Sequence, residues 1–167
     1  MSFIPLTPST NLVAINGVVQ NISAFDNSCC QQQATIRSTE GISNFIISPN
    51  TQVMNNTLLR PGMNVTAFYD ANVAIPLIFP PRYQAIFITK RNPNETVYIG
   101  NFDQNLMAYD GSLQLNIGRN TEILTSNGQR FNCPLGGHLL IVYYSVTTAS
   151  LPPQTTPRKI IVVCLER

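Results

Sequence analysis

Asn50-Thr51-Gln52-Val53 and Asn120-Thr121-Glu122-Ile123 are two copies of one four-residue motif, and they lie 70 positions apart. The residues around the motif also match between the copies. Before the motif the offset is 70, and after it the offset becomes 75, because the second copy carries five extra residues around 126–134. The matched flanking positions are Gly41 with Gly111, Ile47 with Ile117, Gly62 with Gly137, and 68–70 with 143–145. A unit of about 80 residues therefore occurs as a tandem pair.

The duplication divides the chain into an extended arm at 1–10, a first repeat at 11–92 and a second repeat at 93–167. Pro5 and Pro8 keep the arm from forming a helix. Helix signals are nearly absent from the repeats as well, since 12 prolines, 9 glycines and many β-branched residues interrupt every window of helical period. The sequence therefore predicts an all-β protein.

Each repeat is predicted to contain five strands. The strand patterns lie at 11–22, 33–38, 42–48, 63–70 and 84–90 in the first repeat, and at 96–107, 108–110, 112–118, 137–146 and 158–165 in the second. Turn signals that end in or contain glycine join the second and third strands, at Ser38–Gly41 and at Tyr109–Ser112.

Two further features are typical of an OB-like barrel: a bend in the first strand, and a connector without a strand pattern after the third. Gly17 and Gly100 interrupt the first strand of each repeat and predict a bulge or bend. The connectors lie at 51–61 and 120–136. We predict two tandem five-stranded OB-like barrels. Small β-sandwiches are the alternative, because they have the same strand count and one sequence does not give the strand order.

A pair of prolines precedes the last strand of each repeat, Pro80-Pro81 in the first and Pro152-Pro153 in the second. Proline lacks the N–H that a central strand needs, so both pairs are expected in loops or at sheet edges. We interpret them as rigid connectors. A polyproline II segment that acts as a ligand is the alternative.

The surface is predicted to be polar but weakly charged. Charged residues make up 11% of the chain, against about 25% in an ordinary protein, and the formal net charge is +2. Such a surface has little protection against self-association. The N-terminus has no signal-peptide pattern and no window is apolar enough to span a membrane. We therefore expect a chain made in the cytoplasm whose partners are copies of itself.

Four cysteines, Cys29, Cys30, Cys133 and Cys164, are the most distinctive chemical feature. Adjacent cysteines rarely have the geometry to bridge each other, so disulfides from Cys29 and Cys30 should run elsewhere, within the chain or between chains. A reducing compartment would keep all four thiols free, with Cys164 an ordinary core residue. Cross-linking between subunits and free thiols both remain open at this point.

Several loop motifs carry a resemblance to a known group of proteins. They are an entry to the fourth strand formed by Leu59, Pro61 and Gly62, a Pro80-Pro81-Arg82-Tyr83 loop, and Thr155-Thr156-Pro157 before a β-branched run. In these motifs the chain resembles tandem-repeat small β-proteins of spore-forming, clostridial-type bacteria. That group has no settled activity, so the resemblance assigns no functional residue. The vicinal cysteines and the arm are also similar to those of disulfide-linked endospore appendage subunits.

No pattern in the sequence favours catalysis or a cofactor. The single histidine, His138, has no nucleophile motif near it, and the eight acidic residues are dispersed. A metal site would need Cys29, Cys30, Cys133 and His138 together, without the usual ligand spacing. Ten dispersed Lys and Arg residues do not favour a nucleic acid partner. Aromatic residues of the strands are expected to fill the core.

The sequence thus predicts a non-catalytic structural protein that self-associates, as a subunit of a bacterial spore or cell-surface assembly or filament. The arm, through Phe3, Ile4 and Leu6, would add as a strand to the sheet edge of a neighbouring copy. Cysteines would then link the subunits covalently. The alternative function is an OB-type binding module for oligosaccharide, peptide or single-stranded nucleic acid.

Overall fold

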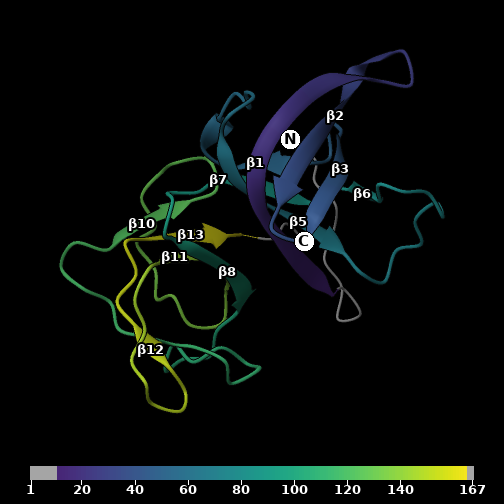
Figure 1. Cartoon of the computed structure of the whole chain (residues 1–167). Coiled ribbons are helices and arrows are strands. Elements are labelled where there is room, and N and C mark those ends of the chain that lie inside the picture. The colour runs from purple at the N-terminus through teal and green to yellow at the C-terminus, as the bar shows by residue number, and fades with distance from the viewer. Residues whose placement is uncertain (1–10, 165–167) are drawn as a thin grey trace. The chain divides into compact units, whose positions relative to one another are not determined.

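Paired strands make up the regular structure of the chain. The computed structural model describes residues 11–164, and these residues form thirteen strands and one short 3-10 turn (Figure 1). The all-β prediction is therefore confirmed. The chain divides at Lys90 and Arg91 into two compact units, each described by itself below. The predicted strand-donating arm at 1–10, with Phe3, Ile4 and Leu6, lies outside the described residues.

Unit 1 consists of a seven-stranded sheet in the order β4-β7-β5-β1-β2-β3-β6. Its elements are β1 (Leu12–Phe25), β2 (Ser28–Ser38), β3 (Gly41–Ile47), β4 (Gln52–Val53), the turn η1 (Met54–Asn56), β5 (Asn64–Asp70), β6 (Arg82–Gln84) and β7 (Phe87–Lys90). The long strand β1 changes partner along its length. Val18 is the crossover, since it pairs with Asn64 of β5 and with Arg37 of β2.

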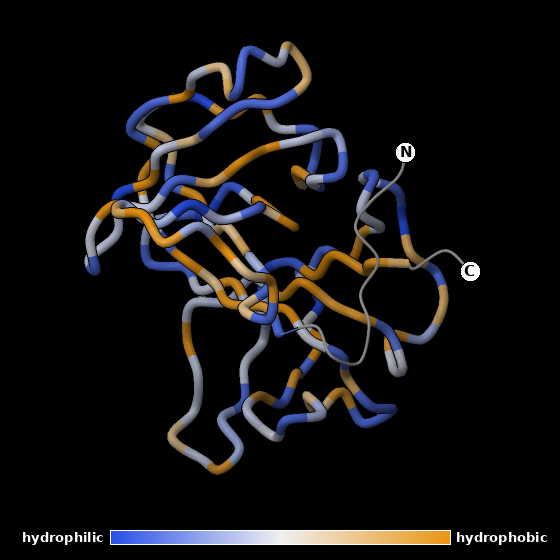
Figure 2. Tube along the Cα trace, turned by 90° about the vertical axis from the view of Figure 1, so that its right-hand side faces the viewer, coloured by the Kyte–Doolittle hydropathy of each residue, from blue (hydrophilic) through white to orange (hydrophobic). Residues whose placement is uncertain are grey.

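The core of unit 1 follows from alternation along the strands. Ile36 of β2, Phe45 of β3 and Val65 of β5 are fully buried, and their neighbours in sequence point to the other face of the sheet. Orange apolar positions recur along the paired strands in Figure 2. β-Branched and aromatic residues suit these positions because they pack well on a pleated surface.

Unit 2 contains a four-stranded sheet in the order β10-β13-β11-β8 and a two-stranded sheet of β12 and β9. Its strands are β8 (Thr96–Asn101), β9 (Gln114–Leu115), β10 (Glu122–Thr125), β11 (Leu139–Tyr144), β12 (Gln154–Thr155) and β13 (Lys159–Val163). The first predicted strand, 96–107, ends early at Asn101. The second, 108–110, is reduced to an isolated bridge between Phe102 and Ala108.

The two units share one set of strand pairings. β4 runs parallel to β7 as β10 does to β13, and β3 runs parallel to β6 as β9 does to β12. β5 lies antiparallel to β1 and β7, as β11 does to β8 and β13. The register of the strand pairs matches too. Gly17 pairs with Val65 in unit 1, and Gly100 pairs with Leu140 in unit 2. Leu140 lies 75 positions after Val65 and is its equivalent in the second repeat.

The repeated Asn-Thr motif makes the same hydrogen bonds in both units. The Thr51 hydroxyl donates to the Ala85 carbonyl at 2.7 Å and accepts from the Ser48 N–H at 3.1 Å. The Thr121 hydroxyl donates to the Pro157 carbonyl at 2.7 Å and accepts from the Gly118 N–H at 3.1 Å. In each unit this threonine therefore ties the connector to the segment that enters the last strand.

Three sequence predictions are corrected here. No sheet is closed into a barrel, so the tandem OB-like barrels are not confirmed. The connectors 51–61 and 120–136 are not free of strands, since they hold β4 and β10, which are too short to produce a strand pattern. The bulge predicted at Gly17 occurs instead between Val19 and Asn21, where the register with β2 shifts.

Candidate functional site

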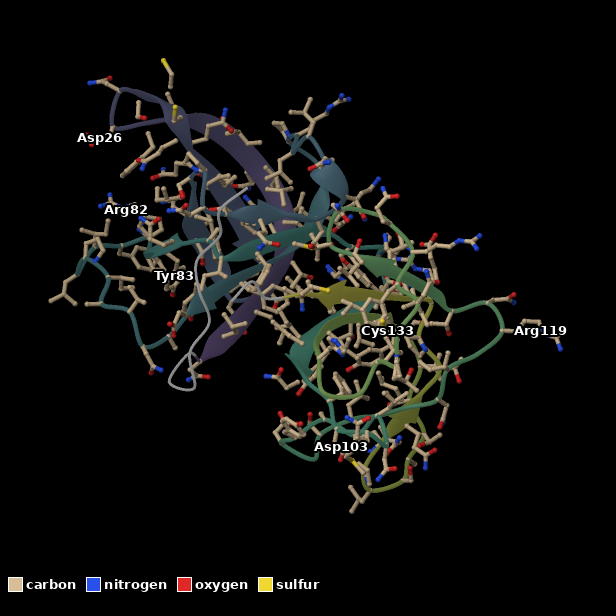
Figure 3. All side chains as sticks on the ribbon, turned by 180° about the vertical axis from the view of Figure 1, so that it is seen from behind. Asp26, Arg82, Tyr83, Asp103, Arg119 and Cys133 are labelled. Carbon is tan, nitrogen blue, oxygen red and sulfur yellow. The ribbon has the colours of Figure 1, made fainter. Side chains whose placement is uncertain are left out.

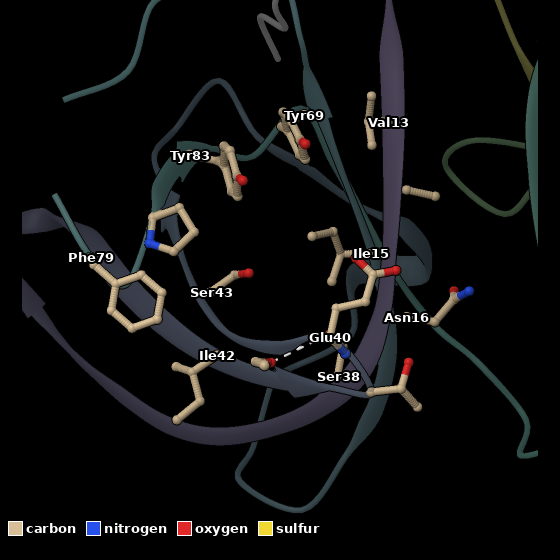
Figure 4. Close-up of a pocket in the computed structure, with 14 residues that line it drawn as sticks. Val13, Ile15, Asn16, Ser38, Glu40, Ile42, Ser43, Tyr69, Phe79 and Tyr83 are labelled. Carbon is tan, nitrogen blue, oxygen red and sulfur yellow. Dashed lines mark hydrogen bonds between the residues drawn. The ribbon is translucent and has the colours of Figure 1, made fainter. Parts of the chain in front are cut away.

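A cavity of about 390 Å³ lies inside unit 1, between the first half of β1, the β2–β3 turn and residues 79–83 (Figure 4). It exists because β1 leaves β2 at Val18, and the residues before Val18 pair with β5 alone. The strands diverge from that point and leave space between them. Cavities of this size commonly hold small ligands in proteins.

Polar groups line one side of this cavity. Ser43 is only 7% exposed, and its hydroxyl has no hydrogen-bond partner within residues 11–164. The hydroxyl borders the open space of the cavity, so its hydrogen-bonding capacity is available to a molecule that enters. Glu40 stands at the rim, and the described residues offer its carboxylate no ion pair. Among the described residues, no Lys, Arg or His lines the cavity.

Two tyrosines form the opposite wall. The rings of Tyr69 and Tyr83 stack with centroids 3.8 Å apart and an interplanar angle of 11°, and Phe45 packs against Tyr83 at 5.4 Å. Figure 4 shows both hydroxyls directed towards the cavity. Burial, together with the hydroxyl of Tyr83, raises the pKa of Tyr69 to about 12. Tyr69 therefore stays a neutral phenol at physiological pH.

A smaller apolar hollow of about 190 Å³ borders the same tyrosine pair and is lined by Val73, Ile75 and Ile86. Val73 and Ile75 belong to the connection between β5 and β6, residues 71–81, which we call the apolar loop (Figure 1). The loop exposes five large apolar side chains, and Phe79 is 91% exposed. They are Val73, Ile75, Leu77, Ile78 and Phe79.

The equivalent loop of unit 2, residues 145–153, also exposes an apolar residue. Leu151 is 97% exposed and precedes Pro152, as Phe79 precedes Pro80, and both peptide bonds are cis. The proline pairs lie outside the strands, as the sequence predicted. Their second carbonyls accept hydrogen bonds, that of Pro81 from the Asn44 N–H and that of Pro153 from the Gln114 N–H.

All four cysteines are exposed and carry free thiols. Cys29 and Cys30 begin β2, just after the turn at Asp26 and Asn27. Cys133 lies on the loop before β11, where Figure 3 labels it. The interpretation of Cys164 as an ordinary core residue is wrong, because β13 ends at Val163 and the residue after it is exposed.

Within residues 11–164, no three His, Cys, Asp or Glu side chains converge to hold a metal ion, so the set weighed for metal binding, Cys29, Cys30, Cys133 and His138, is not brought together. His138 precedes β11, its Nδ1 lies 3.2 Å from the carbonyl oxygens of Leu135 and Gly136, and its ring packs on Phe131. The described contacts of His138 are thus hydrogen-bond contacts within its own loop and one aromatic contact. The described part of the chain also contains no helix of the length and hydropathy needed to span a membrane.

One ion pair was missed by the sequence analysis. Glu95 is buried and accepts two hydrogen bonds from Arg158, at 2.7 Å from Nε and 2.9 Å from Nη2. The hydrogen bond and charge of Glu95 raise the pKa of Arg158. The partners are 63 positions apart, so no local pattern signals the pair. It joins the segment before β8 to the segment before β13 and is structural.

Comparison of the chain with protein-family models, with curated proteins and with solved structures finds no match. Its function therefore has to be inferred from its own residues.

Proposed function

We propose that the protein is a non-catalytic structural subunit that associates with copies of itself through the apolar loop of unit 1. The concentration of five exposed apolar side chains within residues 73–79 supports this proposal. Exposed apolar surface of this kind usually marks a contact with another molecule. Residues 71–81 contain no charged side chain, so the loop itself can be covered without desolvating a charge, and Asp70 is the one charged residue, among those described, that lines the adjoining hollow.

A second copy is a suitable partner because the loop lies beside a hollow of matching chemistry. Leu77 and Phe79 are exposed on the loop, and the apolar hollow is lined by Val73 and Ile75 of the same loop. When the side chains of one copy enter the hollow of the other, the reverse insertion can occur at the same time. Such a self-complementary contact has the two-fold symmetry of most homodimers.

The exposed thiols can make this association covalent. The Arg82 guanidinium lies 5.1 Å from the ring centre of Phe25, so the end of the apolar loop meets the β1–β2 hairpin that carries Cys29 and Cys30. Figure 3 shows Asp26 of the hairpin and Arg82 on the same side of unit 1. Disulfides between subunits would form in an oxidising setting, such as a bacterial spore or cell surface, where we place the assembly.

We also propose an OB-like architecture for unit 1. β6 is the last strand at one end of the strand order and β7 is the second strand from the other end, although only Ala85 and Ile86 separate them in sequence. The Ala85 N–H donates to the Ile46 carbonyl of β3, and the Ile86 N–H donates to the Phe68 carbonyl of β5. Residues 82–90 thus contact both ends of the sheet, which is how a five-stranded OB barrel approaches closure.

The double variant L77S/F79S is expected to weaken self-association at least about 100-fold, because full burial of each side chain contributes roughly 1.5–3 kcal/mol. Sedimentation equilibrium in reductant measures the dissociation constant. Leu58 is also exposed and lies outside the loop, so L58S is the control and should associate like the wild type. A wild-type chain that stays monomeric at about 1 mM, in reductant and without it, would contradict the proposal.

Oxidation is expected to produce cross-linked dimers of the wild type that depend on the hairpin thiols. Non-reducing gel electrophoresis after mild oxidation should show the dimer for wild type and C133S, and no dimer for C29S/C30S, because Cys29 and Cys30 lie beside the proposed contact. Equal cross-linking of C29S/C30S and wild type would show that other cysteines form the links.

A further inference from the structure

The cavity of unit 1 has properties that self-association through the apolar loop does not use. Two of its lining groups, the Ser43 hydroxyl and the Glu40 carboxylate at the rim, have no partner among the described residues. A bound molecule can replace the water that hydrogen-bonds to them. Ser43 faces the open space of the cavity in Figure 4. This side chain is therefore placed to bind a molecule from solution.

The charges around the cavity restrict what can bind. No cationic side chain of residues 11–164 lines it, whereas Glu40 contributes a carboxylate. A phosphate or carboxylate ligand would meet like charge without a compensating partner. The ligand is therefore neutral or cationic, and a nucleic acid backbone is a poor fit.

The mixture of walls favours a neutral ligand that is polar at its edges and apolar on its face. Hydroxyls of Ser43, Tyr69 and Tyr83 can both donate and accept hydrogen bonds, and the Glu40 carboxylate accepts them. Ile15 and Ile42 supply apolar surface in the same cavity. A cation would use only the carboxylate, which is exposed to solvent and therefore screened. A sugar ring uses every wall, through its hydroxyls and its C–H face.

We propose that this cavity binds a short neutral saccharide, held by the hydroxyls of Ser43 and Tyr83 and by the Glu40 carboxylate, with the sugar's C–H face against Ile15. This function is additional to self-association and does not depend on it. An OB-like unit is compatible with it, since OB folds include oligosaccharide binders.

Chemical-shift titration of the ¹⁵N-labelled full chain tests the proposal. Glucose, N-acetylglucosamine, maltose and chitobiose are each added to about 20 mM, the range that resolves millimolar dissociation constants, and Nα-acetyl-lysine amide is the cationic probe. At least one sugar is expected to give saturable shifts at residues 13–16 and 38–43, and the lysine derivative none. Shifts with the lysine derivative alone, shifts elsewhere, or no shifts would each overturn the proposal.

Variants connect the shifts to the named groups. S43A and Y83F are each expected to weaken sugar binding about 3- to 10-fold, the net value of one hydrogen bond. S43A should not lower the melting temperature, because the hydroxyl has no partner to lose among the described residues. S23A changes an exposed serine on the other half of β1 and is the matched control. Unchanged affinity in both S43A and Y83F would overturn the assignment, and sedimentation of the same variants reports self-association separately.

Discussion

Gly17→Ala is expected to destabilise unit 1 by at least about 3 kcal/mol, the upper end of the cost of overpacking. A Cβ atom at this position would lie 2.3 Å from the Arg37 carbonyl oxygen and 2.7 Å from Cγ2 of Ile36. The first of these atoms is backbone in the paired strand β2, so it cannot move aside as the end of a flexible side chain can. The β1–β2 pair would have to open near the crossover at Val18.

Thermal unfolding followed by circular dichroism measures the effect. A loss of about 3 kcal/mol corresponds to a fall of at least about 12 °C in the melting temperature of a domain of this size. Gly62→Ala is the control, because no atom lies within 4 Å of a Cβ there, although its φ of +90° adds backbone strain. That strain costs about 1–2 kcal/mol. Equal effects of the two variants would show that β1 and β2 do not approach so closely at Gly17.

The sequence predicts where Gly17 lies in the fold, but not why a glycine is needed there. Its place in the first strand, equivalent to that of Gly100, is visible in the sequence and agrees with the register of the structure. Its reason is not visible there. The sequence predicts a bulge at this glycine, whereas in the structure a Cβ atom there would collide with the backbone of β2 at Arg37. A repeat pattern locates such a residue, whereas the contact depends on a strand 20 positions away.

The cavity was beyond sequence analysis for a similar reason. Its walls come from residues 13–16, 38–43 and 69–83, and each stretch alone has the pattern of an ordinary strand or turn. Ser43 and Glu40 have no spacing that indicates a site. The Tyr69–Tyr83 stack joins two strands across a long loop. Local periodicity predicts that these segments are strands, but only the pairing order brings them together.

The apolar loop represents the opposite case, in which the sequence contains the signal. Residues 71–81 are apolar except for Asn72, carry no charge and contain a proline pair. Proline argues against a central strand, so a loop could be predicted. The sequence does not predict that Leu77 and Phe79 are exposed, because an apolar run between two strands is also compatible with a buried connection.

Replacing Thr51 by valine is expected to destabilise unit 1 by about 2–4 kcal/mol, because it leaves two backbone groups without a partner. Valine has the shape of threonine but can neither donate to the Ala85 carbonyl nor accept from the Ser48 N–H. Ala85 is fully buried, so water cannot replace the lost bond without opening the connector. Thermal unfolding of T51V, with T51S beside it, measures the loss. T51S keeps the hydroxyl and should cost only about 1 kcal/mol for the methyl group.

The same substitution at Thr121 tests whether the repeated motif has one physical role. Thr121 makes equivalent bonds, to the Pro157 carbonyl and from the Gly118 N–H, but its side chain is less buried than that of Thr51. Water can partly replace its bonds, so T121V should cost about 1–2 kcal/mol. Suppose that T51V and T121V are destabilised while T51S and T121S stay close to the wild type in stability. Both copies then have threonine at this point because the position needs a hydroxyl that donates one hydrogen bond and accepts another. If T51V matches T51S, the hydroxyl does not hold the connector, and the recurrence of the motif reflects the shape of its side chain.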